Sequence, residues 1–121
     1  MKCVIVKNGF VLRSAQQKQT DALKEKLEER GVLVDVKGTD ETITLLDDEK
    51  VRAFVGDADF VLYLDKDPYL SVMLEKAGYN VVNSAKAVET CDDKMKTYLA
   101  LSGSLPIPKT ISAPLNYTMK E

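Results

Sequence analysis

The sequence predicts an α/β fold with a mostly parallel sheet of four or five strands and helices on both faces. Short runs rich in β-branched and apolar residues alternate with longer segments whose apolar residues recur at helical spacing. The strand-like runs are apolar throughout, which is typical of parallel sheets because helices cover both of their faces. These observations together indicate a three-layer, Rossmann-like domain.

The first strand–helix–strand unit occupies about 35 residues. Lys2–Val6 is a β-branched run and predicts a buried strand, and Ser14–Arg30 carries its apolar residues on one helical stripe. Gly31 ends this helix, and Val32–Val36 is the next strand. We expect the crossover between the two strands to be right-handed.

A second helix is expected between Asp47 and Gly56. Asp47 or Asp48 supplies the N-cap, and Gly56 supplies the stop. The preceding segment, Thr39–Leu46, is ambiguous, because it fits either a short strand or a loop.

The third and fourth strands flank a short helix. Asp59–Leu64 is the most apolar strand of the chain, and it leads into Asp67, a natural N-cap. The helix Pro68–Ala77 follows, with proline at its first position and Gly78 as its C-cap. Tyr79–Val82 is the fourth strand.

A further helix begins near an acidic pair. Thr90 is expected to cap it, with Asp93 reaching back in a weaker form of the capping box. Asp92 and Asp93 then suit the positive end of the helix dipole, whereas Lys94 does not unless something anionic meets it. The two carboxylates point about 100° apart on a helix, so capping explains them better than acid–base chemistry or metal binding.

The later part of that helix and its exit carry two simpler signals. Tyr98, Leu99 and Leu101 recur at helical spacing and predict core positions. Pro106 and Pro108 then hold the chain extended, because each fixes its own φ and pushes the preceding residue out of the α region.

Composition excludes several classes of protein. The 121 residues suit one domain, and the formal net charge of −2 favours neither nucleic acid nor an anionic membrane. Histidine is absent, so the Ser-His-Asp and Cys-His arrangements are impossible. Two cysteines without a CxxC pattern, no signal peptide and no membrane-length apolar run indicate a cytoplasmic protein.

Polar residues follow the strands at four places, where an open parallel sheet binds ligands. They come after the first strand at Lys7-Asn8-Gly9, after Val36, at Asp65-Lys66-Asp67, and at Asn83-Ser84. The carboxyl ends of parallel strands meet at one edge, so these segments should lie together. No GxGxxG sequence is present, and a dinucleotide fingerprint is therefore missing.

Three segments in the second half of the chain carry a family resemblance. Asn83-Ser84 after a strand, Asp93-Lys94 before a helix, and Leu105-Pro106-Ile107-Pro108-Lys109-Thr110 after it resemble the ATP-grasp ligases, and among them the RimK-like carboxylate–amine ligases. The resemblance covers the family's N-terminal, pre-ATP-grasp domain, here residues 1–105, and the linker 106–121 that leads into the ATP-grasp domain. It implies the strand order 2-1-3-4 and an ATP-grasp domain downstream.

The resemblance also implies a reaction. In such ligases ATP converts a carboxylate to an acylphosphate, an amine attacks it, and Mg²⁺ helps to balance the phosphates. It implies that Lys94 reaches the ATP phosphates and that Asn8, Asp65 and Lys66 help to receive the small-molecule or peptide substrate. It gives no catalytic residue and no metal ligand to residues 1–121, so this segment alone should be inactive and bind ATP weakly. A homo-oligomer is compatible with the sequence.

Simpler interpretations stay open for each residue. Lys94 fits a solvated helix lysine, Asn8-Gly9 a plain turn, and Asp65-Lys66-Asp67 a turn that ends in an N-cap. The Asn8–Arg13 loop fits a flap, a substrate-side loop or an interface. For the whole chain, the alternative is a flavodoxin-like or response-regulator-like interaction domain with Asp65 as phosphoacceptor, but the expected acidic pair after the first strand is missing. A stand-alone interaction domain that lost the chemistry is a third interpretation.

Overall fold

The computed structural model describes residues 1–11, 14–41 and 47–113. The chain divides into two compact units, Met1–Glu89 and Thr90–Glu121, and each is described by itself. The first unit contains the sheet. The predicted division between residues 105 and 106 stays a prediction.

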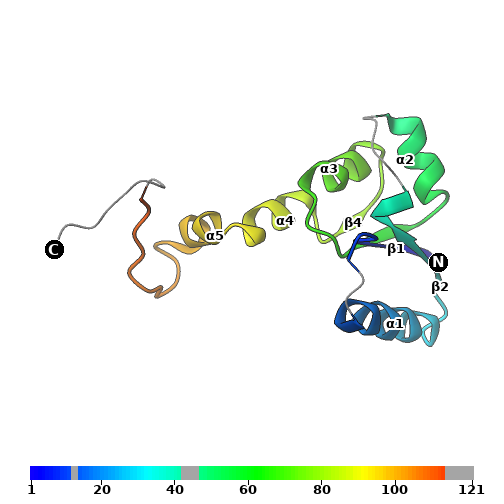
Figure 1. Ribbon diagram of the computed structural model, residues 1–121, viewed down its shortest axis with the longest axis horizontal. Helices are drawn as coiled ribbons and strands as arrows, with labels where there is room; N and C mark the ends of the chain where they lie inside the picture. Colours follow the sequence, from blue (N-terminus) through cyan, green and yellow to red (C-terminus); the bar gives the residue numbers. More distant parts are fainter. Residues whose placement is uncertain (12–13, 42–46, 114–121) are drawn as a thin grey trace. The chain divides into compact units, whose positions relative to one another are not determined.

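The first unit is built on a four-stranded sheet in which every pairing is parallel. Its strands are β1 (Lys2–Lys7), β2 (Leu33–Gly38), β3 (Phe60–Tyr63) and β4 (Val81–Val82). Their order is β2-β1-β3-β4, and β1 and β3 lie at the centre (Figure 1). The α/β class, the parallel sheet and the strand order are thus confirmed.

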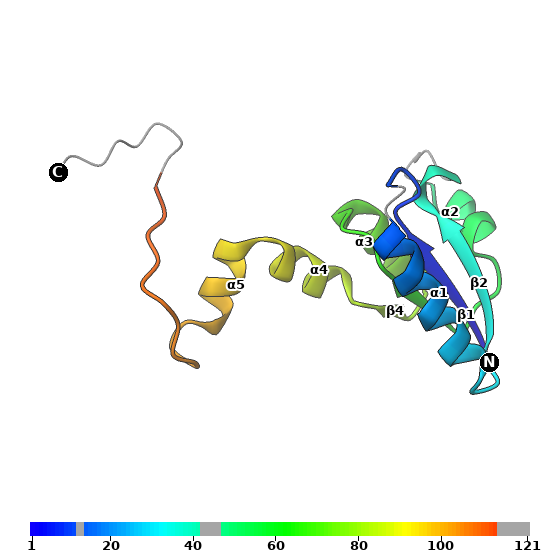
Figure 2. The ribbon, with the colours of Figure 1, turned by 60° about the horizontal axis from the view of Figure 1, so that its bottom comes forward.

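Helices cover both faces of this sheet, as predicted. The helices of the first unit are α1 (Ser14–Glu28), η1 (a 3-10 turn, Thr39–Glu41), α2 (Asp48–Val55), α3 (Pro68–Lys76) and the start of α4 (Ala85–Asp92). Helix α1 lies on one face, and α2 and α3 lie on the opposite face (Figures 1 and 2). This arrangement is the one that right-handed crossovers produce when the chain moves first to one side of β1 and then to the other.

The core lies between the sheet and the α2–α3 layer. Alternate residues of each strand point to opposite faces, so Val4 and Val6 of β1 meet Val61 and Tyr63 of β3 on this side. Residues of α2, α3 and β4 complete the cluster: Val51, Val55, Leu70, Met73, Leu74 and Val81. Cys3 and Ile5 are equally buried, and the alternation points them to the face that α1 covers.

Local sequence signals account for the helix boundaries. The Asp47 carboxylate accepts a hydrogen bond from the Glu49 amide at the start of α2, and Asp67 does the same for Tyr69 at the start of α3. Gly56 ends α2 with φ of 71°, a conformation that glycine adopts without strain. The C-cap of α3 is Ala77 rather than the expected Gly78, which follows it in the left-handed region.

The ambiguous segment before α2 is settled only in part. Thr39–Glu41 forms the 3-10 turn η1, and residues 42–46 lie outside the described residues.

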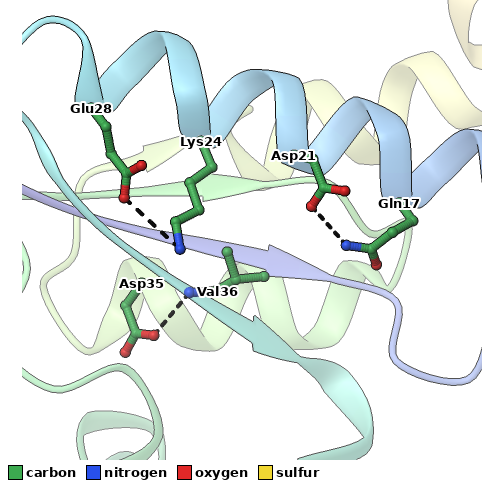
Figure 3. Close-up of polar contacts among 6 residues, drawn as sticks. All are labelled: Gln17, Asp21, Lys24, Glu28, Asp35 and Val36. Carbon is green, nitrogen blue, oxygen red and sulfur yellow. Dashed lines mark hydrogen bonds and ion pairs between the residues drawn. The ribbon is translucent and has the colours of Figure 1, made fainter.

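On the opposite face of the sheet, α1 carries polar pairs along one side, including Gln17 with Asp21 and Lys24 with Glu28 (Figure 3). These i, i+4 contacts are exposed and contribute only a few tenths of a kcal/mol each.

In the second unit, α5 (Lys94–Leu101) begins differently from the prediction. Asp93 is its N-cap, and the Asp93 carboxylate accepts hydrogen bonds from the amides of Met95 and Lys96 at 2.8 and 3.0 Å. The predicted cap, Thr90, lies inside α4 instead. A carboxylate that bonds two backbone amides outcompetes a capping box that lacks its usual glutamate, so the helix starts three residues later.

The predicted core positions of this helix are also wrong. Helix α5 has no buried residue, and Leu99 is 67% exposed. The described part of this unit contains no strand against which an apolar helix face could pack.

Residues 106–113 contain neither helix nor strand, which agrees with the expectation for the proline segment. In the described parts of both units, every helix is too short or too polar to cross a bilayer.

Candidate functional site

The strand order reverses between β1 and β3. From β1 the chain first moves outward to β2, and it then returns past β1 to form β3. In open parallel sheets this reversal opens a crevice at the carboxyl ends of the two strands, because the following loops leave in opposite directions. The fold itself therefore points to the loops after Lys7 and after Tyr63.

A pocket lies at this position. Its volume is about 470 Å³, which suits a small ligand. Its walls come from the loop after β1, the first half of α1 and the loop after β3, and the lining residues are Asn8, Val11, Ala15, Gln16, Gln19, Leu64, Asp65 and Lys66. The three residues that the sequence placed on the substrate side, Asn8, Asp65 and Lys66, are thus all brought together here.

Asn8 and Asp65 are in direct contact. The Asn8 Nδ2 donates to Asp65 Oδ1 at 3.2 Å, while Asn8 Oδ1 accepts from the Phe10 amide at 2.9 Å. The second bond fixes the orientation of the carboxamide, because only its oxygen can accept from an amide. Asp65 Oδ1 also accepts from the Lys66 amide at 2.7 Å. Both loops are therefore tied to one carboxylate oxygen.

A buried tyrosine at the end of β3 stabilises the loop that follows this strand. The Tyr63 hydroxyl donates to the Asp67 carbonyl at 2.7 Å, and the Leu64 amide donates to the Val6 carbonyl at 2.8 Å. Burial raises the pKa of Tyr63, and the charges of Asp65 and Asp67 raise it further. The hydroxyl therefore stays protonated and keeps its donor role at neutral pH.

Contacts with η1 stabilise the loop after β1. The Gly9 amide donates to the Thr39 hydroxyl at 3.1 Å, and the Gly38 amide donates to Glu41 Oε1 at 2.9 Å. The Asp40 carboxylate lies so close to both glycines that a Cβ on Gly9 or Gly38 would overlap its Oδ1. An alanine at either position would therefore require the exposed Asp40 side chain to move.

Helix α1 contributes two pocket residues that the sequence pattern did not single out, Gln16 and Gln19. They are on the stripe of α1 that continues into Leu23, where an apolar residue is the usual choice. Two carboxamides in this stripe were the available signal, and in the structure Gln16 is partly buried and Gln19 is exposed.

The remaining predicted site residue belongs to the second unit. Lys94 is exposed and is the first residue of α5. Asp93 already accepts the hydrogen bonds of the Met95 and Lys96 amides, so a phosphate at this helix start would have to be bound by side chains, of which Lys94 is the first in α5. Asn83 and Ser84 follow β4 and are exposed, and Ser84 Oγ accepts from the Ala87 amide at 3.2 Å in the first turn of α4.

No group of three or more His, Cys, Asp and Glu side chains among the described residues could hold a metal ion. The fold and the pocket define an α/β protein with an open parallel sheet and a pocket of small-molecule size at its strand reversal. No protein-family model matches the chain, and no curated protein matches it. The structure thus establishes the α/β fold class, while the likeness to the ATP-grasp ligases remains a resemblance in sequence.

Proposed function

We propose that this chain is the N-terminal domain of an ATP-dependent carboxylate–amine ligase and that the pocket between β1 and β3 receives one of its two substrates. The observation that carries the proposal is the meeting of Asn8 and Asp65 at the strand reversal, beside a pocket of about 470 Å³. The strand order β2-β1-β3-β4 supports it as well, because it is the order that the resemblance implies.

The residues present fit one part of an ATP site. Lys94 would hold phosphate oxygens as a point charge on a flexible stem, and the exposed proline segment 106–113 would lead into the domain that holds the rest. ATP, when bound, supplies the phosphoryl group that activates the carboxylate. The resemblance assigns the ligands of Mg²⁺ to the downstream domain.

Within this domain, the work of the pocket is binding and orientation. Asn8 and Lys66 hold Asp65 in place through its Oδ1, and the side chains of α1 form the facing wall. Fixing a substrate in such a frame lowers the entropic cost of its later reaction. The domain alone should therefore bind a substrate weakly and catalyse nothing.

The proposal predicts that the coding sequence continues beyond residue 121, and the test uses the protein that it specifies. We expect a second domain with a lysine on a strand, a glycine-rich loop and late carboxylate and amide metal ligands. In that protein, Lys94→Ala should raise the KM for ATP about tenfold or more, because one cation on the phosphates is lost. Lys96→Ala, two residues along the same helix and about 200° around it, is the matched control. An unchanged KM for Lys94→Ala would remove this residue from the site.

One observation favours the alternative of a response-regulator-like binding domain. Asp65 closely follows the third strand, where a phosphoacceptor would lie. Its neighbour is the neutral Asn8 rather than an acidic residue that could share a cation with it. Incubation with acetyl phosphate and Mg²⁺, followed by measurement of the intact mass, separates the two functions. Only the alternative predicts that the chain becomes phosphorylated and that Asp65→Asn abolishes this phosphorylation.

A further inference from the structure

The lining of the pocket between β1 and β3 combines charged, carboxamide and apolar side chains. Its lining contains one carboxylate, three carboxamides and one ammonium group, together with the apolar side chains of Val11, Ala15 and Leu64. Carboxamide oxygens and a carboxylate are acceptors for a cationic nitrogen, while the apolar residues suit a short carbon chain.

Several of these polar groups have no partner among the described residues. Both hydrogen bonds to the Asp65 carboxylate, from Asn8 and from the Lys66 amide, end on Oδ1, which leaves Oδ2 without a bond from the described chain. The side chains of Gln16 and Gln19 likewise make no hydrogen bond within the described chain. An acceptor oxygen and two carboxamides are therefore presented together in the pocket.

We propose that this pocket binds the amine substrate, as a primary ammonium group held by Asp65 Oδ2 and the side-chain oxygens of Gln16 and Gln19. The role of the bound amine as a substrate rests on the proposed function, but the binding of an ammonium group in this pocket does not. The hydrogen bonds to Oδ1 fix the carboxylate before the ligand arrives, so little side-chain entropy remains to be lost on binding.

The competing ligand is the carboxylate substrate, with Lys66 as its partner. Lys66 is exposed and already has an interaction of its own, whereas Asp65 is half-buried and fixed. An incoming carboxylate would also meet the negative charge of Asp65 within the same small pocket. An incoming ammonium group would meet the charge of Lys66 in the same way, but that side chain is exposed and flexible whereas Asp65 is fixed, so the arrangement favours a cation.

The experiment uses the 121-residue chain and three probes of similar size: butylammonium, butyrate and butanol. Two-dimensional ¹⁵N NMR observes the side-chain NH₂ groups of Asn8, Gln16 and Gln19 directly, so each probe can be followed in the pocket itself. We expect saturable shifts of these signals with butylammonium, and much smaller shifts with the other two probes at the same concentration.

Asp65→Asn should weaken butylammonium binding about tenfold or more, since a charge-assisted hydrogen bond is lost while the bonds to Asn8 and Lys66 can persist. Asp57→Asn, which removes a carboxylate from the loop before β3 at the other end of the strand, should leave it unchanged. If Asp65→Asn does not fold, Gln19→Ala, at an exposed helix position, should weaken binding severalfold.

Butyrate shifts that Lys66→Gln abolishes would overturn the proposal in favour of the acid substrate. Equal shifts with all three probes would reduce the pocket to an apolar surface, and no shift with butylammonium would also refute it. These outcomes are independent of the test of the ligase: a coding sequence without the expected second domain, together with butylammonium binding in the pocket, would reject the ligase and keep the amine site.

Discussion

The carboxamide of Asn8 lies 3.2 Å from the carboxylate of Asp65, with Nδ2 donating to Oδ1 across 57 positions of sequence. This contact joins the loops that follow the two central strands, β1 and β3. It closes one side of the pocket while leaving the second carboxylate oxygen without a partner in the described chain. One long-range contact between two polar side chains thus joins the two loops that border the candidate site.

Removing this contact should lower stability measurably. Asn8→Ala loses the bonds to Asp65 and to the Phe10 amide, and we expect the free energy of unfolding to fall by about 1–2 kcal/mol. Urea titration followed by circular dichroism measures it. Gln17→Ala is the control, because it also loses two hydrogen bonds, to Lys7 and Asp21, but at an exposed site (Figure 3). If Gln17→Ala lowered the free energy of unfolding by more than about 0.5 kcal/mol, burial would not explain the larger contribution expected of Asn8.

The close approach of Asp40 to Gly9 predicts a mutual dependence between these residues. Gly9→Ala should destabilise the protein by about 1 kcal/mol, because the new Cβ overlaps the Asp40 carboxylate and this exposed side chain has to turn away. In an Asp40→Gly background the same substitution should cost less than half as much. Urea titration of the four proteins forms a double-mutant cycle, and additive effects would contradict the packing described above.

The buried hydroxyl of Tyr63 predicts a loss of stability at alkaline pH. Its pKa is raised above the ordinary value of 10.0, so below about pH 10 its contribution to folding is fully present. As the pH rises further, the unfolded chain loses the proton first, and the free energy of unfolding falls by up to about 1.4 kcal/mol per pH unit until the folded pKa is reached. Burial shifts the pKa values of Cys3 and Tyr79 in the same direction.

Tyr63→Phe isolates the tyrosine's share of this effect. The variant should be about 1 kcal/mol less stable at neutral pH, since the bond to the Asp67 carbonyl is lost, but its stability should fall less steeply above pH 10. Denaturant titrations at several pH values measure the slope. Tyr69→Phe, at an exposed position of α3, is the control and should keep the original slope; an unchanged slope for Tyr63→Phe would be the contrary result.

The Asp93 cap predicts a local effect in the second unit. Asp93→Ala removes the hydrogen bonds to Met95 and Lys96 and should destabilise α5 by about 1 kcal/mol. Because α5 buries no side chain, the effect should appear as reduced helical ¹³Cα shifts over residues 94–101 rather than in global unfolding. Asp93→Asn should restore the helix, since asparagine caps as well as aspartate; loss of helicity in both variants would point to charge instead of capping.

The sequence predicted the sheet well because its signals are local. The β-branched run after Met1, the N-caps Asp47 and Asp67 and the glycine after α2 each act within a few residues, and the structure confirms them. The strand order came from the resemblance, and it too is confirmed.

The errors came from choices that local pattern does not decide. Thr90 and Asp93 both fit an N-cap, and only the backbone geometry shows that Asp93 makes the bonds. Leu99 has a helical apolar pattern but no surface to cover within the described part of its unit. Gln16 and Gln19 join the site because α1 borders the same pocket as the loop after β3, a relationship between distant segments that their own neighbours in sequence do not encode.

The packing of Asp40 against Gly9 and Gly38 has a dynamic consequence. The Gly9 amide donates to the Thr39 hydroxyl and Gly9 packs against the Asp40 side chain, so a shift of the backbone after β1 would break these contacts unless η1 moves with it. Any closure of the β1 loop over a bound molecule would have to carry the turn after β2 with it. The two loops should therefore respond to ligand as a single hinged body, although only one of them lines the pocket.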